Sequence, residues 1–459
     1  MSTTITPRYE ALRDVLEGTI VEPGDPEFAA AAQAFNLTVV QQPELVALPA
    51  DEQDVIAIVN FARAHGMRVA PQRTGHNAEP LGALDDVILV RTDDMRGVEI
   101  DAERRVARVR AGSKWEDVVP AASQLGLAAL HGSTPDVSVA GYVLGGGLGW
   151  YARKLGLAAN SVLAIEVVTA DGRLRRVDAE HEPELFWALR GGGGNFGVVT
   201  ALEIQLFDIP EVYAGVLFFE WQRSAEVLQA WREWTQTVPD EMTSVGRILQ
   251  IPPLPEVPEP FRGRQFVLVE AIFVGSREDG DALMAPLRAL GPEIDTITMV
   301  PPVGIAELHM DPPDPLPYMG EGGMLGPIDA EAIDRFVAAV GPGSGSALVS
   351  VELRHAGGEL HRARPGGGAI ATLDAEFVTF AVGAVLDAGS VDALDETLTA
   401  LRAALAPYDS GREYLNFAEH HTDPARFYPP QTYARLRAAK AAYDPGRLFK
   451  ANHEITPSL

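Results

Sequence analysis

The sequence predicts an α+β protein built from two domains, and three observations support this prediction. Between residues 50 and 206, short helical and strand patterns alternate quickly. Beyond Ile209-Pro210 the predicted strands become longer and are separated by helices and proline-rich loops. The chain of 459 residues is also longer than a single domain usually is.

The first region contains clear start, stop and turn signals. Asp51 is predicted to cap a helix that ends at His65-Gly66. Asp171-Gly172 predicts a hairpin between strands at 162–169 and 174–177, because this dipeptide readily adopts positive φ angles. The other elements expected here are strands at 68–70, 87–90, 98–100, 106–111 and 196–207, and helices at 115–125 and 184–190.

The second region is predicted to hold longer strands, at residues 215–221, 265–274, 347–354 and 376–385. The proline-rich stretches 252–260 and 312–317 cannot form central strands or helices. Trp231 and Trp234 lie three positions apart on a predicted helix, which favours core packing over a ligand platform.

The last fifty residues form a third segment. Residues 414–417 read as a short strand and 431–442 as a helix with Leu436 and Ala439 on one face. Residues 443–446 then form a turn. The pattern alone does not say which domain this tail joins.

Composition excludes several classes of function. The 37 basic and 64 acidic residues give a net charge of −27, which repels phosphate backbones and anionic lipids. We therefore expect no nucleic-acid partner and no membrane partner. The absence of cysteine from the sequence excludes a disulfide, a thiolate nucleophile, an iron–sulfur cluster and a cysteine-ligated zinc.

The amino-terminal residues 1–10 lack the apolar core of a signal peptide. No run of 18 apolar residues occurs in the sequence, so no membrane span is expected. Together these features predict a cytoplasmic protein.

Glycine-rich segments are the strongest candidates for a binding site. Residues 141–149 and 191–197 each contain several glycines, which let a backbone approach a ligand closely and present its N–H groups. The second segment contains G-x-G-x-x-G, but a helix precedes it and a strand follows, the reverse of a Rossmann fingerprint. Either segment could equally be a sharp turn.

The polar loop at residues 70–77, with Arg73 and His76, could cradle a pyrophosphate. A single histidine in such a loop is more often an ordinary loop residue. His420 and His421 are adjacent and no carboxylate spacing completes a ligand set, so we expect no metal site.

Taken together, the order of these motifs resembles the berberine bridge enzyme-like branch of the vanillyl-alcohol oxidase/p-cresol methylhydroxylase flavoproteins. The resemblance runs from about residue 39 to 207 and resumes at 414–455. The motifs that carry it are Arg-Thr-Gly-His at 73–76, Val-Ser-Val-Ala-Gly-Tyr-Val-Leu-Gly-Gly-Gly-Leu-Gly-Trp at 137–150, the stretch 185–199, Tyr-Leu-Asn at 414–416 and Tyr-Asp-Pro-Gly-Arg-Leu-Phe at 443–449.

The resemblance implies a two-part FAD-binding domain of the p-cresol methylhydroxylase type and an α+β substrate domain with an antiparallel sheet. The FAD-binding domain would occupy residues 1–210 with its core at 39–207, the substrate domain 211–408, and residues 409–459 would return to the FAD-binding domain.

The resemblance also implies roles for individual residues. His76 matches the histidine that the family bonds to the 8α-methyl group of FAD, and Tyr414 matches a tyrosine that serves as base in some members. The other residues matched to cofactor contacts are Pro71, Gln72, Arg73, Thr74, Gly75, Asn77, Thr134, Val139, Ala140, Gly141, Tyr142, Gly145, Gly146, Val198, Val199 and Asn416.

Two departures from the family pattern matter. Doubly tethered members have a cysteine where this chain has Thr134, so FAD is expected to be bonded through His76 only. Aligned on His76, Gln72 takes the place of the family's arginine and Thr74 that of its first glycine, which leaves the role of Arg73 open.

The expected activity is an FAD-linked oxidase that removes hydride from a small alcohol, sugar, alkaloid or polyketide substrate, with oxygen reoxidising the flavin to give hydrogen peroxide. Tyr414 would need a nearby positive group, such as Arg73, to act as a base near neutral pH. The alternatives are a dehydrogenase with another electron acceptor and a cofactor-free binding protein that kept the fold. Neither the substrate nor an oligomeric state is indicated.

Overall fold

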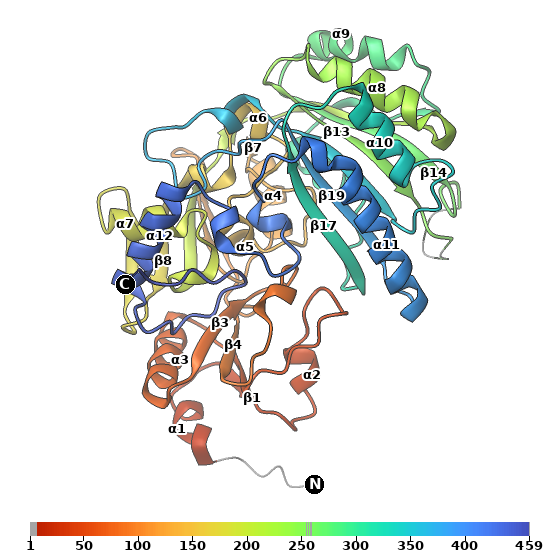
Figure 1. The fold of residues 1–459 in the computed structure, drawn as a ribbon. Coiled ribbons are helices and arrows are strands. Elements are labelled where there is room, and N and C mark those ends of the chain that lie inside the picture. Colours follow the sequence, from red (N-terminus) through yellow and green to blue (C-terminus); the bar gives the residue numbers. More distant parts are fainter. Residues whose placement is uncertain (1–6, 254, 256, 258, 459) are drawn as a thin grey trace.

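The computed structural model describes residues 7–253, 255, 257 and 259–458, whose elements form two regions (Figure 1). The first region contains two principal sheets, and the second contains one large sheet with helices along one face. Residues 1–6, on which part of the signal-peptide prediction rests, and residues 254, 256 and 258 of the proline-rich loop lie outside the described residues.

A four-stranded sheet opens the first region, with the strand order β1-β2-β4-β3. Its strands are β1 (Thr19–Val21), β2 (Leu45–Leu48), β3 (Arg68–Gln72) and β4 (Val87–Arg91). Helix α3 (Glu52–His65) connects β2 to β3. It begins as predicted, because the Asp51 side chain accepts hydrogen bonds from the N–H groups of Gln53 and Asp54. It ends at Gly66, whose φ of +68° belongs to the left-handed region.

The second sheet is antiparallel and has the order β5-β6-β10-β8-β9. Its strands are β5 (Val98–Asp101), β6 (Val106–Arg110), β8 (Val162–Val168), β9 (Leu174–Asp178) and β10 (Val198–Gln205). The predicted hairpin is confirmed, since β8 pairs with β9 and Gly172 in the turn has a φ of +72°. Helices α4 (Trp115–Ser123), α5 (Val139–Leu144) and α7 (Pro183–Leu189) share a core with this sheet.

Shorter elements complete the first region. They are α1 (Glu10–Arg13), α2 (Phe28–Ala31), α6 (Ala152–Leu155), β7 (Leu127–Ala128) and β11 (Phe207–Asp208).

The second region is built on an antiparallel eight-stranded sheet in the order β15-β12-β14-β13-β18-β19-β17, with β16 paired to β12. The strands are β12 (Val212–Glu220), β13 (Met242–Gln250), β14 (Gln265–Phe273), β15 (Ile294–Asp295), β16 (Thr298–Val300), β17 (Tyr318–Leu325), β18 (Ser350–His355) and β19 (Phe377–Ala384). The four predicted strands correspond to β12, β14, β18 and β19, whereas β13 and β17 were not predicted.

One face of this sheet is covered by α8 (Ser224–Thr235), α9 (Arg277–Arg288), α10 (Ala330–Val340) and α11 (Ala388–Leu405) (Figure 1). Trp231 and Trp234 of α8 are buried there, as predicted. Val351 and Leu353 of β18 belong to the same core. Since side chains alternate along a strand, Glu352 and Arg354 lie on the opposite face, toward the first region.

The tail beyond residue 409 packs against the first region. The N–H of Val69 in β3 donates to the carbonyl of Leu448 at 2.9 Å, and the N–H of Lys450 donates back to the Val69 carbonyl at 2.9 Å. The predicted helix is present as α12 (Pro430–Tyr443), with Leu436 and Ala439 buried. The predicted strand at 414–417 is wrong, because Leu415–Phe417 form one turn of 3-10 helix.

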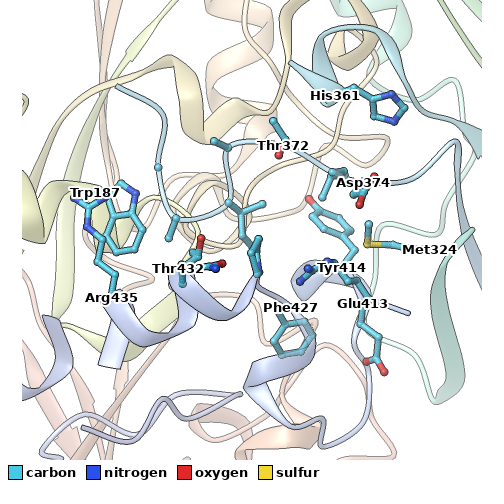
Figure 2. A pocket seen from close by; sticks show the side chains of 18 residues that line it. Trp187, Met324, His361, Thr372, Asp374, Glu413, Tyr414, Phe427, Thr432 and Arg435 are labelled. Atoms are coloured by element: carbon cyan, nitrogen blue, oxygen red, sulfur yellow. The ribbon is translucent and has the colours of Figure 1, made fainter. Parts of the chain in front are cut away.

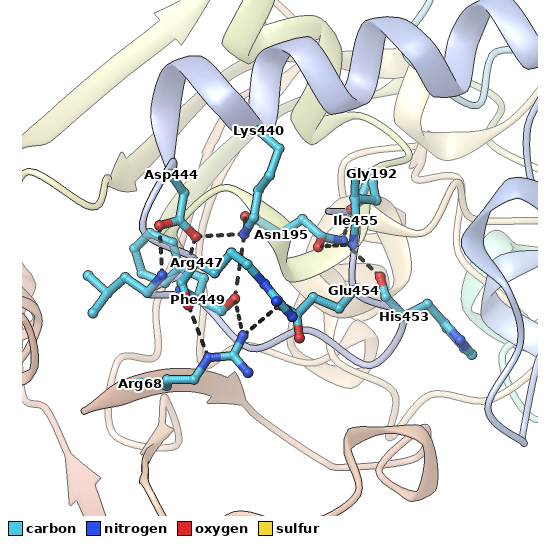
Figure 3. A network of polar contacts seen from close by, with 11 residues as sticks. Arg68, Gly192, Asn195, Lys440, Asp444, Arg447, Phe449, His453, Glu454 and Ile455 are labelled. Carbon is cyan, nitrogen blue, oxygen red and sulfur yellow. Dashed lines mark hydrogen bonds and ion pairs between the residues drawn. The ribbon is translucent and has the colours of Figure 1, made fainter. Parts of the chain in front are cut away.

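Figure 3 shows how the end of α12 is fixed. The ammonium of Lys440 donates to the carbonyl of Asn195 and to the carboxylate of Asp444, each at 2.6 Å. Asp444 also accepts the N–H groups of Leu448 at 2.7 Å and Phe449 at 3.1 Å. Lys440 and Asp444 are both completely buried, so this ion pair belongs to the core.

None of the described helices combines the length and apolar character needed to cross a membrane.

Candidate functional site

The loop that follows β3 carries His76 and lies where the first region, the second region and the tail meet. The imidazole ring stacks on Phe35 with a centroid separation of 3.8 Å. Its Nδ1 lies 2.8 Å from the hydroxyl of Thr74, and its Nε2 lies 3.3 Å from a carboxylate oxygen of Asp136. The hydroxyl of Tyr318 in β17 donates to the His76 carbonyl at 3.0 Å. His76 is therefore fixed through its ring and its backbone.

The neighbouring loop residues have mainly internal partners. Gln72 is buried and exchanges amide hydrogen bonds with Gln41 at 2.9 and 3.0 Å. Asn77 donates to the carbonyl of Ala418 in the tail at 3.0 Å. Gly75 has a φ of +77°, and a Cβ there would meet the Gln72 side chain. Pro71 lies in β3, opposite Val90 of β4.

Arg73 was expected to place a positive charge beside Tyr414, but it has other partners. Its guanidinium donates to the carbonyl of Gly112 at 2.8 Å and to Asp93 at 2.7 Å. The positive charge that acts on the Tyr414 hydroxyl is instead that of Arg354 in β18. The prediction of Arg73 as the cation beside Tyr414 is therefore wrong.

The segment from Thr134 to Gly146 lies next to the His76 loop and contains α5. The hydroxyl of Thr134 donates to Asp311 of the second region at 2.5 Å. Val139 and Ala140 are buried in the core, whereas Gly141 is exposed. The Tyr142 ring packs closely against Gly132, Gly147 and Gly149.

Two glycines of this segment are required by their neighbours. A Cβ on Gly145 would overlap the side-chain amide of Asn416. Gly146 has a φ of +114°, and a Cβ there would lie 3.4 Å from the Tyr414 ring. The segment is thus fitted tightly against the two tail residues that the sequence singled out.

Tyr414 is 2% exposed, and its hydroxyl oxygen accepts two hydrogen bonds. The donors are the N–H of Leu148 at 2.8 Å and the side-chain amide of Asn416 at 3.2 Å. Burial raises the pKa of Tyr414 above its ordinary value and outweighs these donors and the charge of Arg354, which act in the opposite direction. Tyr414 and Asn416 therefore meet as predicted, through a helical turn rather than along a strand.

Val198 and Val199 occupy the start of β10, where they pair with Val168 and Val167 of β8. Both side chains are buried among apolar neighbours of the first region.

A buried group of charged residues on the second region was missed by the sequence reasoning. His309 lies 2.7 Å from Glu270 through Nδ1 and 3.1 Å from Glu352 through Nε2. Arg247 pairs with Glu270 at 3.1 Å, and Arg354 pairs with Glu352 at 2.7 Å. Arg354 also donates to Ser133 at 3.2 Å, so this group reaches the loop that contains Thr134. These residues are far apart in sequence, and no local motif marks them.

His309 has a strongly shifted pKa. Burial and the nearby Arg247 lower the pKa of this imidazole, but the carboxylates of Glu270, Asp311 and Glu352 outweigh them and raise it to about 9. The pKa of Glu352 is shifted in the opposite direction. Burial acts against the charged carboxylate, but the nearby positive charges of Arg354 and His309 lower the pKa of Glu352 to about 2. His309 is therefore a cation between carboxylates at neutral pH.

The raised pKa of His309 predicts that the stability of the fold depends on pH. Because the folded-state pKa of about 9 exceeds the value of about 6.5 for a free histidine, the stabilisation is complete below pH 6.5. It should be lost as the pH rises from about 6.5 to 9. Urea unfolding at several pH values should show this decline in the wild type and a much flatter dependence in His309→Asn. The exposed-site control His181→Asn should keep the wild-type slope, and an unchanged slope in His309→Asn would contradict the assignment.

A cavity of about 540 Å³ lies at the junction of the second region, the tail and α7 (Figure 2). Tyr414 lines it together with Met324, His361 and Asp374. Trp187, Thr432 and Arg435 line the other end. Of the predicted site residues only Tyr414 borders this cavity, and no residue of the loop 70–77 lines it.

Comparison with known proteins identifies the two segments that meet at Asn77, next to His76. Residues 43–178 match the FAD binding domain family, and residues 413–456 match the berberine and berberine-like family. Over 214 residues the chain is 35% identical to (R)-6-hydroxynicotine oxidase of Paenarthrobacter nicotinovorans, covering 46% of each protein. The chain thus spans about half the length of the curated relatives that it matches.

Solved structures extend the likeness to the whole fold. The 6-hydroxy-D-nicotine oxidase of Arthrobacter nicotinovorans superimposes with a TM-score of 0.82 and 28% identity, covering 96% of this chain and 98% of that one. A glucooligosaccharide oxidase of Acremonium strictum, described as revealing a novel flavinylation, gives a TM-score of 0.85 at 21% identity, with complete coverage of both chains. These superpositions confirm the predicted α+β fold class. The chain therefore contains segments similar to the FAD binding domain family and to the berberine and berberine-like family, and it has the fold of 6-hydroxy-D-nicotine oxidase.

Proposed function

We propose that this protein is an oxidase that binds FAD covalently through His76 alone and removes hydride from a small organic substrate. The observation that carries the proposal is that the two family-matched segments meet at Asn77, next to His76. Asp136 of the first segment faces the imidazole ring, and Ala418 of the second accepts a hydrogen bond from Asn77.

The residues around His76 fit a flavin. Among the described residues, Nε2 of His76 and Oδ1 of Asp136 are buried polar atoms without a hydrogen-bond partner, which is the condition expected where a polar ligand binds. The segment 71–77 and the segment from Thr134 to Gly146 would hold the cofactor with backbone N–H groups. Thr134 cannot form a second covalent bond to flavin, because it carries a hydroxyl where doubly tethered relatives have a thiol.

When bound, FAD accepts hydride from the substrate and transfers the electrons to oxygen. In this proposal Tyr414 takes the proton that leaves the substrate, and Asn416 fixes the position of its hydroxyl. Arg354 favours the phenolate form of Tyr414, and its guanidinium also donates to Ser133 in the loop that contains Thr134.

The substrate class stays broad within this proposal. The relatives include a nicotine oxidase and oligosaccharide oxidases, which supports a small organic molecule as substrate and oxygen as electron acceptor. The cytoplasmic location stays a prediction.

Acid precipitation tests the attachment of the cofactor. Wild-type protein should give a yellow pellet, because a covalent bond survives unfolding, and His76→Ala should release the colour to the supernatant. A colourless wild-type pellet from yellow native protein would overturn the covalent bond and leave FAD binding standing. Native protein without a flavin spectrum would favour the cofactor-free binding protein.

Peroxide release tests the reaction. A panel of alcohols, sugars and cyclic amines should contain a substrate that bleaches the flavin without oxygen and yields hydrogen peroxide in air. Bleaching that air does not reverse, but that an artificial electron acceptor does, would identify a dehydrogenase instead.

A further inference from the structure

The imidazole of His76 has a carboxylate neighbour that no motif predicted. Asp136 is 3% exposed, and one of its oxygens lies 3.3 Å from Nε2 of His76. Its other oxygen has no hydrogen-bond partner among the residues that the structure describes. A carboxylate buried in this way is costly unless it serves a nearby positive charge, and the described ion pairs give Asp136 no partner except His76.

The ring is held by other contacts as well. Thr74 lies 2.8 Å from Nδ1, Phe35 stacks on one face, and Tyr318 fixes the backbone carbonyl. Asp136 is therefore not needed to keep the ring in place. Its particular contribution is a negative charge beside the nitrogen.

We infer that Asp136 stabilises the positive charge that develops on His76 during covalent attachment of flavin and accepts the proton that the ring loses. This inference rests on the proposed function, in which His76 bears the cofactor. Asp136 acts through His76, so it is a positioning and proton-accepting residue for attachment rather than part of substrate oxidation.

The attachment step balances as follows in atoms and electrons. One N–C bond forms between Nδ1 of His76 and the 8α-carbon of FAD, while one C–H bond of that methyl group and the N–H bond at Nε2, the nitrogen that faces Asp136, break. Two protons and two electrons leave, and molecular oxygen takes up both to give hydrogen peroxide. The ring carries a positive charge between formation of the N–C bond and loss of its proton, and a carboxylate at 3.3 Å stabilises that charge.

The test follows attachment, not turnover. Apoprotein is mixed with FAD, and the covalent fraction is measured over time from the colour of acid-precipitated protein and from the intact mass. Asp136→Asn keeps the shape of the side chain and removes its charge. It should bind FAD as wild type does, by native absorbance, but should attach it roughly 10²-fold more slowly, as expected for a lost proton acceptor.

Two further variants guard against a folding defect. Asp281→Asn removes a carboxylate from α9, on the helical face of the second region, and should attach FAD at the wild-type rate. In Asp136→Ala, added formate should accelerate attachment in proportion to its concentration, whereas chloride should not. If Asp136→Asn fails to bind FAD, the formate response of Asp136→Ala decides the question.

Attachment in Asp136→Asn at the wild-type rate, or an Asp136→Ala variant that formate does not accelerate, would overturn the inference. Wild-type protein that binds FAD but never attaches it would also overturn it, together with the covalent part of the proposed function. Slow attachment in Asp136→Asn with normal FAD content supports it.

Discussion

Replacing Tyr414 with phenylalanine should slow reduction of the flavin by substrate by roughly 10²–10⁴-fold, the usual contribution of a positioned general base. The flavin content should not change. The hydroxyl of Tyr414 already accepts two hydrogen bonds, from Leu148 and Asn416, and the same two donors would stabilise the phenolate. The rate of flavin bleaching in stopped-flow experiments without oxygen measures the effect directly.

A purely structural role for Tyr414 gives a different result. Loss of its hydrogen bonds would cost about 1–3 kcal/mol of stability and leave the reduction rate nearly intact. Tyr213→Phe is the matched control, since it also removes a tyrosine hydroxyl that has hydrogen-bond partners. Those partners are Asp281 and Arg288, on the helical side of the second region. A rate in Tyr414→Phe within about threefold of wild type, far below the effect of losing a base, would exclude Tyr414 as the proton acceptor.

Replacing Lys440 with methionine should lower the free energy of unfolding by about 3–5 kcal/mol, because it leaves the buried carboxylate of Asp444 without its cation. The carbonyl of Asn195 also loses its donor. The midpoint of urea unfolding, with the slope compared between variants, measures the loss.

An exposed ion pair provides the comparison for Lys440. Arg335→Met breaks the pair with Glu331 on α10, whose side chains are 45% and 63% exposed, and should cost at most about 1 kcal/mol. Equal effects of the two substitutions would show that Lys440 is hydrated in solution.

The fold could be predicted where local signals decide the structure. Asp51 and Gly66 bound α3, and Asp171-Gly172 forms the expected turn, because capping and turn geometry depend on adjacent residues. The segment 414–417 was predicted wrongly because Tyr-Leu-Asn-Phe favours a strand only where a partner strand is available. Strand β17 was missed because Gly320, Gly322 and Gly323 weaken its pattern, although the neighbouring β19 supplies the pairing.

The candidate site shows the same limit. The resemblance pointed to His76, Tyr414 and Asn416, and the structure brings Tyr414 and Asn416 into contact. Asp136 and the charged group around His309 could not be found, because their partners come from distant positions in the chain. Arg73 was assigned to the wrong neighbour for the same reason, since sequence does not show that Asp93 lies closer to it.

The contact between β3 and the tail has a consequence for the order of events during synthesis. Arg68 and Phe449 are hydrogen-bonded although they are 381 positions apart. At 5–20 residues per second, a ribosome needs roughly 20–80 s to make the chain between them. Throughout that interval β3, although paired with β4, lacks its hydrogen bonds to the tail, and the loop bearing His76 lacks Ala418. The second region can fold on the ribosome before the first region is complete, whereas the cofactor pocket is assembled only after the tail has emerged.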